Sequence, residues 1–245
     1  MAARGYGWVP DRPDQRDYLY KTIRPVVRLP KKVDLREFCS IVENQEALGS
    51  CTANALAGNL EYLDHRIDDA YEDVSRLFIY YNERVLEGTV DYDSGASLRD
   101  GIKTLRKQGA CWEKTWPYVI ERFDRKPLKK CYMEAKKHCI ESYHRINSLP
   151  EMLTCLAEGY PFVFGFTVYE SFQSQRVART GVANMPRKKE KVLGGHAVMA
   201  AGYNQSQKRF LVRNSWGAQW GKDGYFTMPY EYLETLSADF WTIRK

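Results

Sequence analysis

The 245-residue sequence predicts an α+β protein of two lobes, with helices in the first half of the chain and strands in the second. Two patterns lead to this prediction. Apolar residues recur at helical intervals after Cys51, whereas runs rich in β-branched and aromatic residues extend from Pro161 to Met228. Because the two patterns occupy separate parts of the chain, we expect two packed lobes with a cleft between them.

Composition and charge exclude several classes of protein. Apolar residues make up 44% of the chain and charged residues 28%, as in an ordinary globular protein with a large core. The net charge of +6 is modest and no basic stripe is interleaved with aromatic residues, so we expect no nucleic-acid partner. No apolar run approaches membrane-spanning length, and residues 1–20 lack the apolar core of a signal peptide. We therefore expect no membrane partner and favour an intracellular location.

Residues 1–32, the leader, differ in composition from the rest of the chain. The stretch 5–18 is rich in Pro, Asp and aromatic residues and has no helical period, which predicts an extended segment. A disordered tail is the alternative. Leaving Trp8 and Tyr18 in water is costly, which favours a leader packed against the body.

The helical lobe is expected over residues 33–142. Its first helix begins at Cys51, and the recurrence of apolar residues gives that helix one apolar face. Gly109 is a plausible C-cap for the third helix. Further helices of this lobe are predicted over 77–86, 97–107 and 129–139, and a shorter helix is predicted beyond it, over 149–158.

The strand-rich lobe is expected over residues 143–245, and together the two lobes form one unit. Strands are predicted over 161–168, 196–203, 209–213 and 224–228. A polar turn at 204–207 joins the middle two as a hairpin. Pairing about that turn places Asn214 opposite Ala197, beside His196, with an uncertainty of one register.

The stretch Asn44-Gln45-Glu46-Ala47-Leu48-Gly49-Ser50-Cys51 is the candidate for the chemistry. A thiol at a helix start lies at the positive end of the helix dipole, which predicts a lowered pKa for Cys51. Free backbone N–H groups there can hold an oxyanion, and the preceding loop can bring the Gln45 amide to the same place. Taken alone, Cys51 is better explained as a buried structural cysteine, because free cysteine is among the most buried residue types.

A cysteine nucleophile needs a base, and the base needs a group that orients it. His196 follows two glycines and opens an apolar strand, and the predicted hairpin brings the Asn214 amide beside it. Asn214 can accept a hydrogen bond from one ring nitrogen and direct the other toward Cys51. A histidine in a strand is otherwise often a satisfied core residue, so the prediction depends on all three residues meeting.

Three separated motifs in the order Gln, Cys, His, Asn resemble the papain family of cysteine proteases. They are the stretch ending at Cys51, Gly194-Gly195-His196-Ala197-Val198, and Asn214-Ser215-Trp216-Gly217-Ala218-Gln219-Trp220-Gly221. The resemblance runs from about Val33 to the end. It implies a papain-like two-lobe fold, with a helical left lobe and an antiparallel β-barrel-like right lobe. It also implies catalysis without a cofactor or metal, and the catalytic residues Cys51, His196, Asn214 and Gln45.

The resemblance also suggests where a substrate binds. Trp216 would shield the Asn–His bond from water, and Trp220 would border the leaving-group side of the cleft. A glycine-containing loop at 93–96 would pair with an extended peptide. The pocket for the residue two before the scissile bond would be roomy and apolar, unless its glycines only serve backbone turns. The expected substrate-binding residues are Gly49, Gly95, Gly165, Gly194, Gly195, Trp216, Trp220 and Ala238.

Two departures from the family pattern stand near the nucleophile. Leu48 occupies the place of a usual disulfide cysteine, and Thr52 replaces a usual tryptophan. The spacing of the six cysteines and the absence of a C-x-x-C pair favour reduced thiols without a zinc site. The pattern is similar to the short-leader branch found in bacteria and large viruses.

The function expected from these features is a monomeric cysteine endopeptidase acting on protein or peptide substrates. Cys51 would form a thioester intermediate, and the chain would be made as a latent enzyme with its own N-terminal segment in the cleft. The alternative is a catalytically silent peptide-binding protein on the same scaffold.

Overall fold

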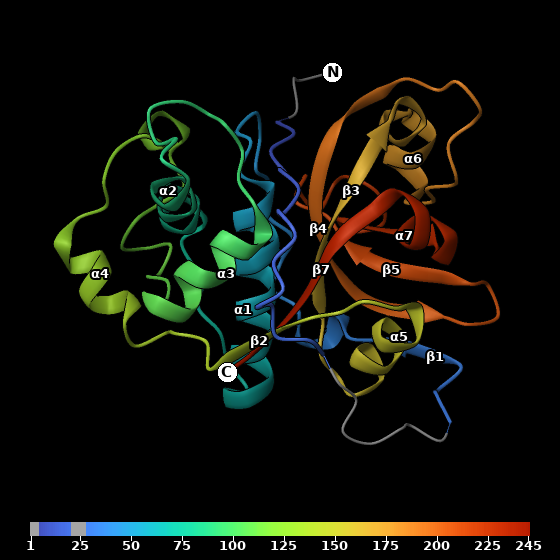
Figure 1. The fold of residues 1–245 in the computed structure, drawn as a ribbon, viewed down its shortest axis with the longest axis horizontal. Coiled ribbons are helices and arrows are strands. Elements are labelled where there is room, and N and C mark those ends of the chain that lie inside the picture. The colour runs from blue at the N-terminus through green and yellow to red at the C-terminus, as the bar shows by residue number, and fades with distance from the viewer. Residues whose placement is uncertain (1–4, 21–27) are drawn as a thin grey trace.

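The computed structural model describes residues 5–20 and 28–245. Four helices of its described part form the helical lobe (Figure 1). α1 is the central helix of this lobe, buried from Cys51 to Asp64, and α2 and α3 pack against it. The bounds are α1 (Cys51–Asp68), α2 (Arg76–Glu87), α3 (Leu98–Lys107) and α4 (Lys129–Ala135).

The second lobe is built on an antiparallel sheet with the strand order β2-β7-β3-β4-β5-β6, and β1 adds to it by pairing with β4. Three short helices, α5 (Leu149–Ala157), α6 (Gln175–Thr180) and α7 (Tyr230–Leu236), pack around the sheet. The strands are β1 (Lys32–Asp34), β2 (Ser142–Arg145), β3 (Phe162–Tyr169), β4 (Val192–Asn204), β5 (Arg209–Arg213), β6 (Tyr225–Pro229) and β7 (Ser237–Arg244).

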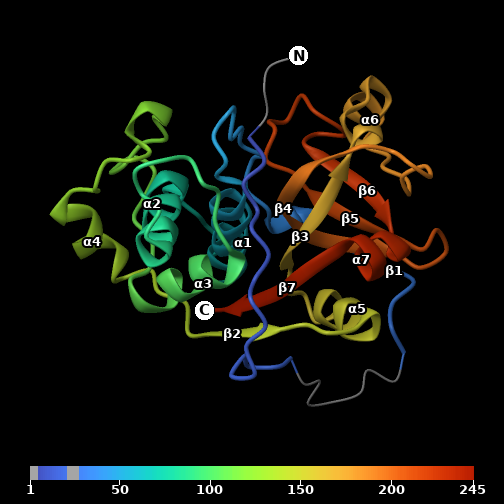
Figure 2. The same ribbon diagram turned by 45° about the horizontal axis from the view of Figure 1, so that its top comes forward.

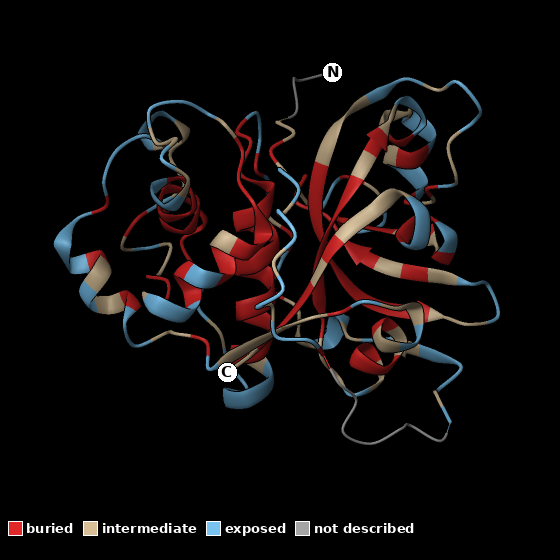
Figure 3. Cartoon of the chain, in the orientation of Figure 1, coloured by how far each residue is buried: buried red, intermediate tan, exposed pale blue. Residues whose placement is uncertain are grey.

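The two lobes meet where α1 packs against β3, β4 and β7. One apolar core joins the helices to the sheet face that carries Ala197, Met199 and Trp241, and a second core fills the β lobe. Buried segments therefore line both sides of the junction (Figure 3). Residues 5–20 of the leader run along this junction, between α1 and α3 on one side and β3, β4 and β7 on the other (Figure 2).

The α+β architecture predicted from the sequence is correct, and most predicted elements appear within one or two residues. The helix expected over 129–139 ends at Ala135, so Cys139 lies beyond it. Gln108 is at the C-cap position of α3, and Gly109 ends the helix just after it, with φ +75° and its N–H donating to the Leu105 carbonyl at 3.1 Å. β1, β2, β7, α6 and α7 were not predicted from the sequence.

The hairpin of β4 and β5 forms, but its register differs from the predicted one. Met199 pairs with Arg213, which places Asn214 one residue further along β4 than Ala197, within the stated uncertainty. Toward the turn the offset grows by another residue, because β4 has a register shift within 200–202. The loop itself closes through Lys208, whose φ of +50° is left-handed.

Within residues 5–20 and 28–245, no helix is long and apolar enough to cross a membrane.

Candidate active site

Cys51 is the first residue of α1 and is fully buried, with Ser50 at the N-cap position. Backbone N–H groups of Ala197, Gly7 and Thr52 approach its thiol and favour the thiolate. Burial outweighs them and raises the pKa of Cys51 to about 11. The lowered pKa expected from the helix start is therefore wrong for this structure, because the leader contributes to a site in which the thiol is removed from water.

His196 and Asn214 meet as the sequence analysis predicted they would. His196 Nε2 lies 2.8 Å from Asn214 Oδ1, and both side chains are buried. The Trp216 ring stacks on the imidazole, with centroids 4.9 Å apart, and Phe166 meets the imidazole ring edge-on at 5.7 Å. This hydrogen bond therefore lies in an aromatic, low-dielectric environment, where such bonds are strengthened. The neighbouring Ala197 amide, which approaches the Cys51 thiol, brings the histidine segment to the nucleophile.

The Gln45 side chain is held by hydrogen bonds at both ends of its amide. Ser215 Oγ donates to Gln45 Oε1 at 2.6 Å, and Gln45 Nε2 donates to the Leu48 carbonyl at 2.9 Å. Nε2 also donates to the carbonyl oxygen of Gly5, at 3.1 Å. Gln45 therefore presents an N–H to a leader carbonyl beside the nucleophile. Sequence reasoning missed Ser215 as its positioning residue, although it follows Asn214 within the quoted motif.

A second group missed from the sequence fixes the loop before Cys51. The backbone N–H of Gly49 donates to both carboxylate oxygens of Asp93, at 3.1 and 3.0 Å. Tyr80 donates its hydroxyl proton to Asp93 and accepts from the Gly95 N–H at 3.1 Å. Gly49 and Gly95, both expected near substrate, are thus tied together through α2. Asp93 is the first residue of the quoted glycine loop, although no role was predicted for its side chain, whereas nothing in the sequence singled out Tyr80.

The Trp8 indole fills the space beside two of the glycines expected to line a substrate pocket, and we call this space the Trp8 pocket. β3 and β7 pair Gly165 with Ala238, and Gly195 lies on the adjacent β4. A Cβ placed on Gly165 would lie 1.9 Å from the Trp8 ring, and one on Gly195 would lie 2.6 Å from it, so both glycines make room for the indole. The expectation of an apolar pocket needs correction, because the buried Asp239 carboxylate also lies near Trp8: burial raises the pKa of Asp239, and the indole opposes that rise.

The leader backbone crosses the lobe junction in an extended path that forms one isolated β-bridge. Gly7 accepts from the Ala96 N–H at 2.7 Å and Val9 donates to the Ala96 carbonyl at 2.9 Å, in a parallel bridge. Trp8 donates to the Gly195 carbonyl at 3.2 Å on the opposite wall. The glycine loop at 93–96 is therefore engaged with an extended chain, and that chain is the leader.

The residues before Gly7 lie on the histidine side of the cleft. The Tyr6 ring meets His196 at 6.2 Å and Trp216 at 6.4 Å, in both cases edge-on, and its hydroxyl accepts a hydrogen bond from the Gln173 amide. A Cβ on Gly194 would lie 2.9 Å from the Tyr6 Cβ. The leader therefore runs from the histidine side, past the nucleophile, to the Trp8 pocket.

Trp220 was expected to border the substrate cleft, but its described ring contacts all lie within the β lobe. Its ring meets Trp216 at 5.0 Å, Phe172 at 5.6 Å and Phe226 at 5.7 Å. It therefore supports the shielding ring of Trp216 from behind in this leader-covered structure.

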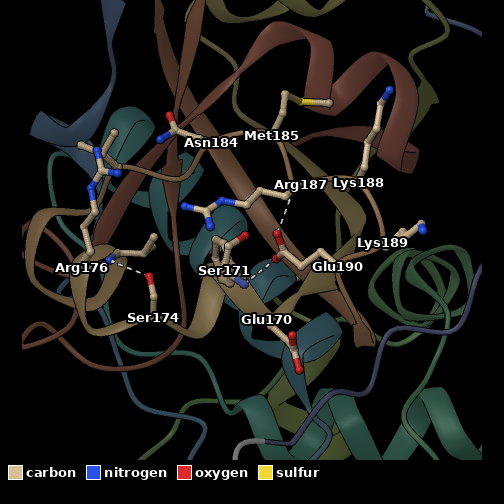
Figure 4. A pocket seen from close by; sticks show the side chains of 13 residues that line it. Glu170, Ser171, Ser174, Arg176, Asn184, Met185, Arg187, Lys188, Lys189 and Glu190 are labelled. Carbon is tan, nitrogen blue, oxygen red and sulfur yellow. Dashed lines mark hydrogen bonds between the residues drawn. The ribbon is translucent and has the colours of Figure 1, made fainter.

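A separate hollow of about 630 Å³ opens on the β lobe between the loop after β3 and the basic run 186–191. Arg187, Lys188 and Lys189 are exposed at its rim, and Glu190 accepts hydrogen bonds from the backbone N–H groups of Ser171 and Arg187 (Figure 4). None of the predicted catalytic or substrate-binding residues lines it.

The two-lobed fold and the meeting of cysteine, histidine and asparagine at the lobe junction define the class of thiol hydrolases. A sequence family described as papain family cysteine protease matches residues 29–236, and the chain belongs to this family. It is a papain-like cysteine peptidase.

Two relatives resemble the chain over nearly its whole length. The peptidase C1-like protein L477 of Acanthamoeba polyphaga mimivirus is 41% identical, covering 99% of this chain and 88% of the relative. Xylellain, a cysteine protease from Xylella fastidiosa, is 42% identical in sequence, and its crystal structure matches with a TM-score of 0.92. The match covers 100% of this chain and 97% of xylellain. Pro-cathepsin H of Mus musculus is 26% identical; the match covers 80% of this chain and 59% of the relative.

Proposed function

We propose that this cysteine peptidase is an endopeptidase made in a latent form, with residues 5–11 of its leader occupying the substrate cleft. The observation that carries the proposal is the Gln45 amide, which donates to the Gly5 carbonyl while Trp8 fills the neighbouring pocket. A leader carbonyl thus takes a donor suited to an oxyanion, and a leader side chain takes the place of a substrate side chain.

The arrangement of the catalytic residues supports a thioester mechanism. Cys51 attacks the peptide carbonyl as a thiolate, and the carbonyl oxygen becomes an oxyanion held by the Cys51 N–H and the Gln45 amide. His196 then protonates the leaving amine, and the C–N bond breaks to give a thioester. The imidazole next takes a proton from water, which attacks the thioester and releases the acid and the thiol. Asn214 orients the imidazole throughout.

The polarity of the leader supports inhibition instead of self-cleavage. Since His196 protonates the leaving amine, the C-terminal part of a substrate must lie on the histidine side and the N-terminal part in the pocket. The leader places the earlier residue Tyr6 on the histidine side and the later residue Trp8 in the pocket. Its chain therefore runs opposite to a productive substrate. Because the leader is tethered, it competes at a high effective concentration.

The test compares an intact chain with one cut after folding. Residues 21–27 are replaced by the recognition sequence of a sequence-specific protease, and the product after cutting is called the nicked chain. We expect initial rates on a small fluorogenic peptide to rise at least tenfold when the nicked chain is diluted, and to fall again when a peptide of residues 5–20 is added. A folded nicked chain that is no faster than the intact chain would show that the leader is not inhibitory.

A Cys51→Ala nicked chain is the control for the chemistry. It should bind the leader peptide but hydrolyse nothing. Hydrolysis by this variant at the rate of the unsubstituted nicked chain would remove Cys51 from the mechanism.

A further inference from the structure

Asp11 of the leader inserts its carboxylate into a closed site beyond the Trp8 pocket. The side chain is 0% exposed. Its Oδ1 accepts the backbone N–H of Arg99, in the first turn of α3, at 3.2 Å, and its Oδ2 accepts the Trp241 Nε1–H at 2.8 Å. The Arg145 guanidinium lies 3.7 Å away. We call these three groups, the Arg99 N–H, the Trp241 indole N–H and the Arg145 guanidinium, the carboxylate receptor.

The carboxylate receptor discriminates a carboxylate from an amide of the same shape. Each oxygen of Asp11 accepts from a different donor. An asparagine in its place would turn its NH₂ group toward one of those two N–H donors. That donor would then be buried without an acceptor, which costs free energy comparable to a lost hydrogen bond.

The charges around the carboxylate receptor depend on the leader. Arg99 pairs with Asp17 at 2.6 Å, and Arg145 pairs with Asp17 at 3.1 Å and with Asp239 at 2.9 Å. Two of the three carboxylates in this network, Asp11 and Asp17, belong to the leader. When the leader leaves, Arg99 and Arg145 lose their shared partner Asp17, while Asp239 and the nearby Glu87 of α2 remain. The vacated site then has two arginines that have lost a partner and two N–H donors without their acceptors.

We propose that the carboxylate receptor binds an acidic side chain of the substrate. The released enzyme then prefers extended polypeptides that carry Asp or Glu on the N-terminal side of the scissile bond. This inference deepens the proposed function and rests on it. The leader's Asp11 occupies the place that the substrate's acidic residue takes during cleavage.

The path of the leader fixes which substrate position is read. Trp8 lies in the pocket expected for the residue two before the scissile bond, and Asp11 lies three residues beyond it. Three extended residues span about 10 Å. A productive substrate crosses this distance with the opposite polarity, so the acidic residue stands four to six positions before the scissile bond.

The experiment measures kcat/KM of the nicked chain at pH 7.5 on matched fluorogenic peptides. Each peptide has an aromatic residue two before the scissile bond, and either Asp or Asn at the fourth, fifth or sixth position before it. We expect Asp to exceed Asn by about tenfold at one of these positions, mainly through KM, because Asn leaves one buried N–H donor without an acceptor. The same peptides are titrated onto the Cys51→Ala nicked chain, where Kd should show the same order.

Substitutions within the carboxylate receptor should remove this preference. Arg145→Gln and Trp241→Phe are each expected to bring the Asp-to-Asn ratio to within about threefold, and Arg145→Lys to retain part of it. Trp241→Phe keeps an aromatic ring in the core, so this variant still tests the carboxylate receptor if Arg145→Gln fails to fold. Arg106→Gln, an exposed charge on the same helix α3, is the matched control and should keep the full ratio.

The outcomes separate the inference from the proposed function. A ratio within twofold at all three positions, in an enzyme that cleaves the Asn peptides, would overturn the carboxylate receptor and leave the peptidase mechanism standing. If the nicked chain cleaves nothing, the proposed function fails. The Kd ratio on the Cys51→Ala chain then decides the inference, which is overturned if Asp and Asn peptides bind equally.

Discussion

Replacing Trp8 by alanine should convert the intact chain from a slow enzyme to a fast one. The indole is half-buried between two strands, and Gly165 and Gly195 leave it the space that their own side chains would fill. Tryptophan-to-alanine changes in cores cost about 3–5 kcal/mol. Because the ring is only half-buried, we expect Trp8→Ala to weaken leader docking by about 3 kcal/mol, which is about 150-fold in the docking equilibrium constant.

The assay is the initial rate of the uncut chain on a small fluorogenic peptide. Trp8→Ala should raise this rate at least tenfold and at most about 150-fold, the limit set by the docking free energy. Val9→Ala is the matched control: Val9 is 43% exposed and its backbone bond to Ala96 is kept, so the rate should change less than about twofold. A folded Trp8→Ala chain with the rate of the parent would refute the packing argument.

Three further predictions concern the catalytic pair, the docking acid and the thiols. Asn214→Ala should lower kcat by about 10- to 100-fold while His196→Ala lowers it by about 1,000-fold or more, because the first orients the base and the second is the base; equal losses in folded variants would contradict these roles. Burial and the neighbouring Asp239 raise the pKa of Asp11 to about 6 from 3.8 when the leader is docked, whereas Arg99 and Trp241 oppose the shift. Leader docking is therefore strongest below about pH 4 and weakens as the pH rises through about 6. Weaker docking frees more of the enzyme, so the rate of the intact parent divided by that of intact Asp11→Asn should increase from pH 4.5 to 7.5. A flat ratio would argue against this titration. Mass spectrometry of the native alkylated protein should find six alkylated cysteines and no disulfide, and any cysteine pair, above all one with Cys39 or Cys111, would contradict a reduced set.

The sequence was sufficient for the fold class and for the residues that meet at the lobe junction. Apolar periodicity defined α1, and the polar turn defined the hairpin that brings Asn214 to His196, because both signals are local. β7 was missed because Ser237–Arg244 completes its sheet by pairing with β2 and β3, which are distant in sequence. Short helices such as α7 depend on packing, which leaves little periodic signal.

The environment of the nucleophile could not be predicted from local sequence. A helix start lowers a thiol pKa only when water or a cationic partner supports the charge, and burial of Cys51 outweighs the nearby backbone donors. The carboxylate receptor could not be predicted from local sequence either. It joins the leader, α3, β2 and β7, whose residues Asp11, Arg99, Arg145 and Trp241 are brought together only by the tertiary fold.

The central claim is that the leader covers a competent Cys51 thiol. The most direct measurement is the rate at which a thiol-directed epoxide inhibitor labels Cys51 in the intact chain and in the diluted nicked chain, read by peptide mass spectrometry. We expect labelling to be at least tenfold faster after nicking, and to slow again when the leader peptide of residues 5–20 is restored. Equal labelling rates before and after nicking, in folded protein, would contradict the claim.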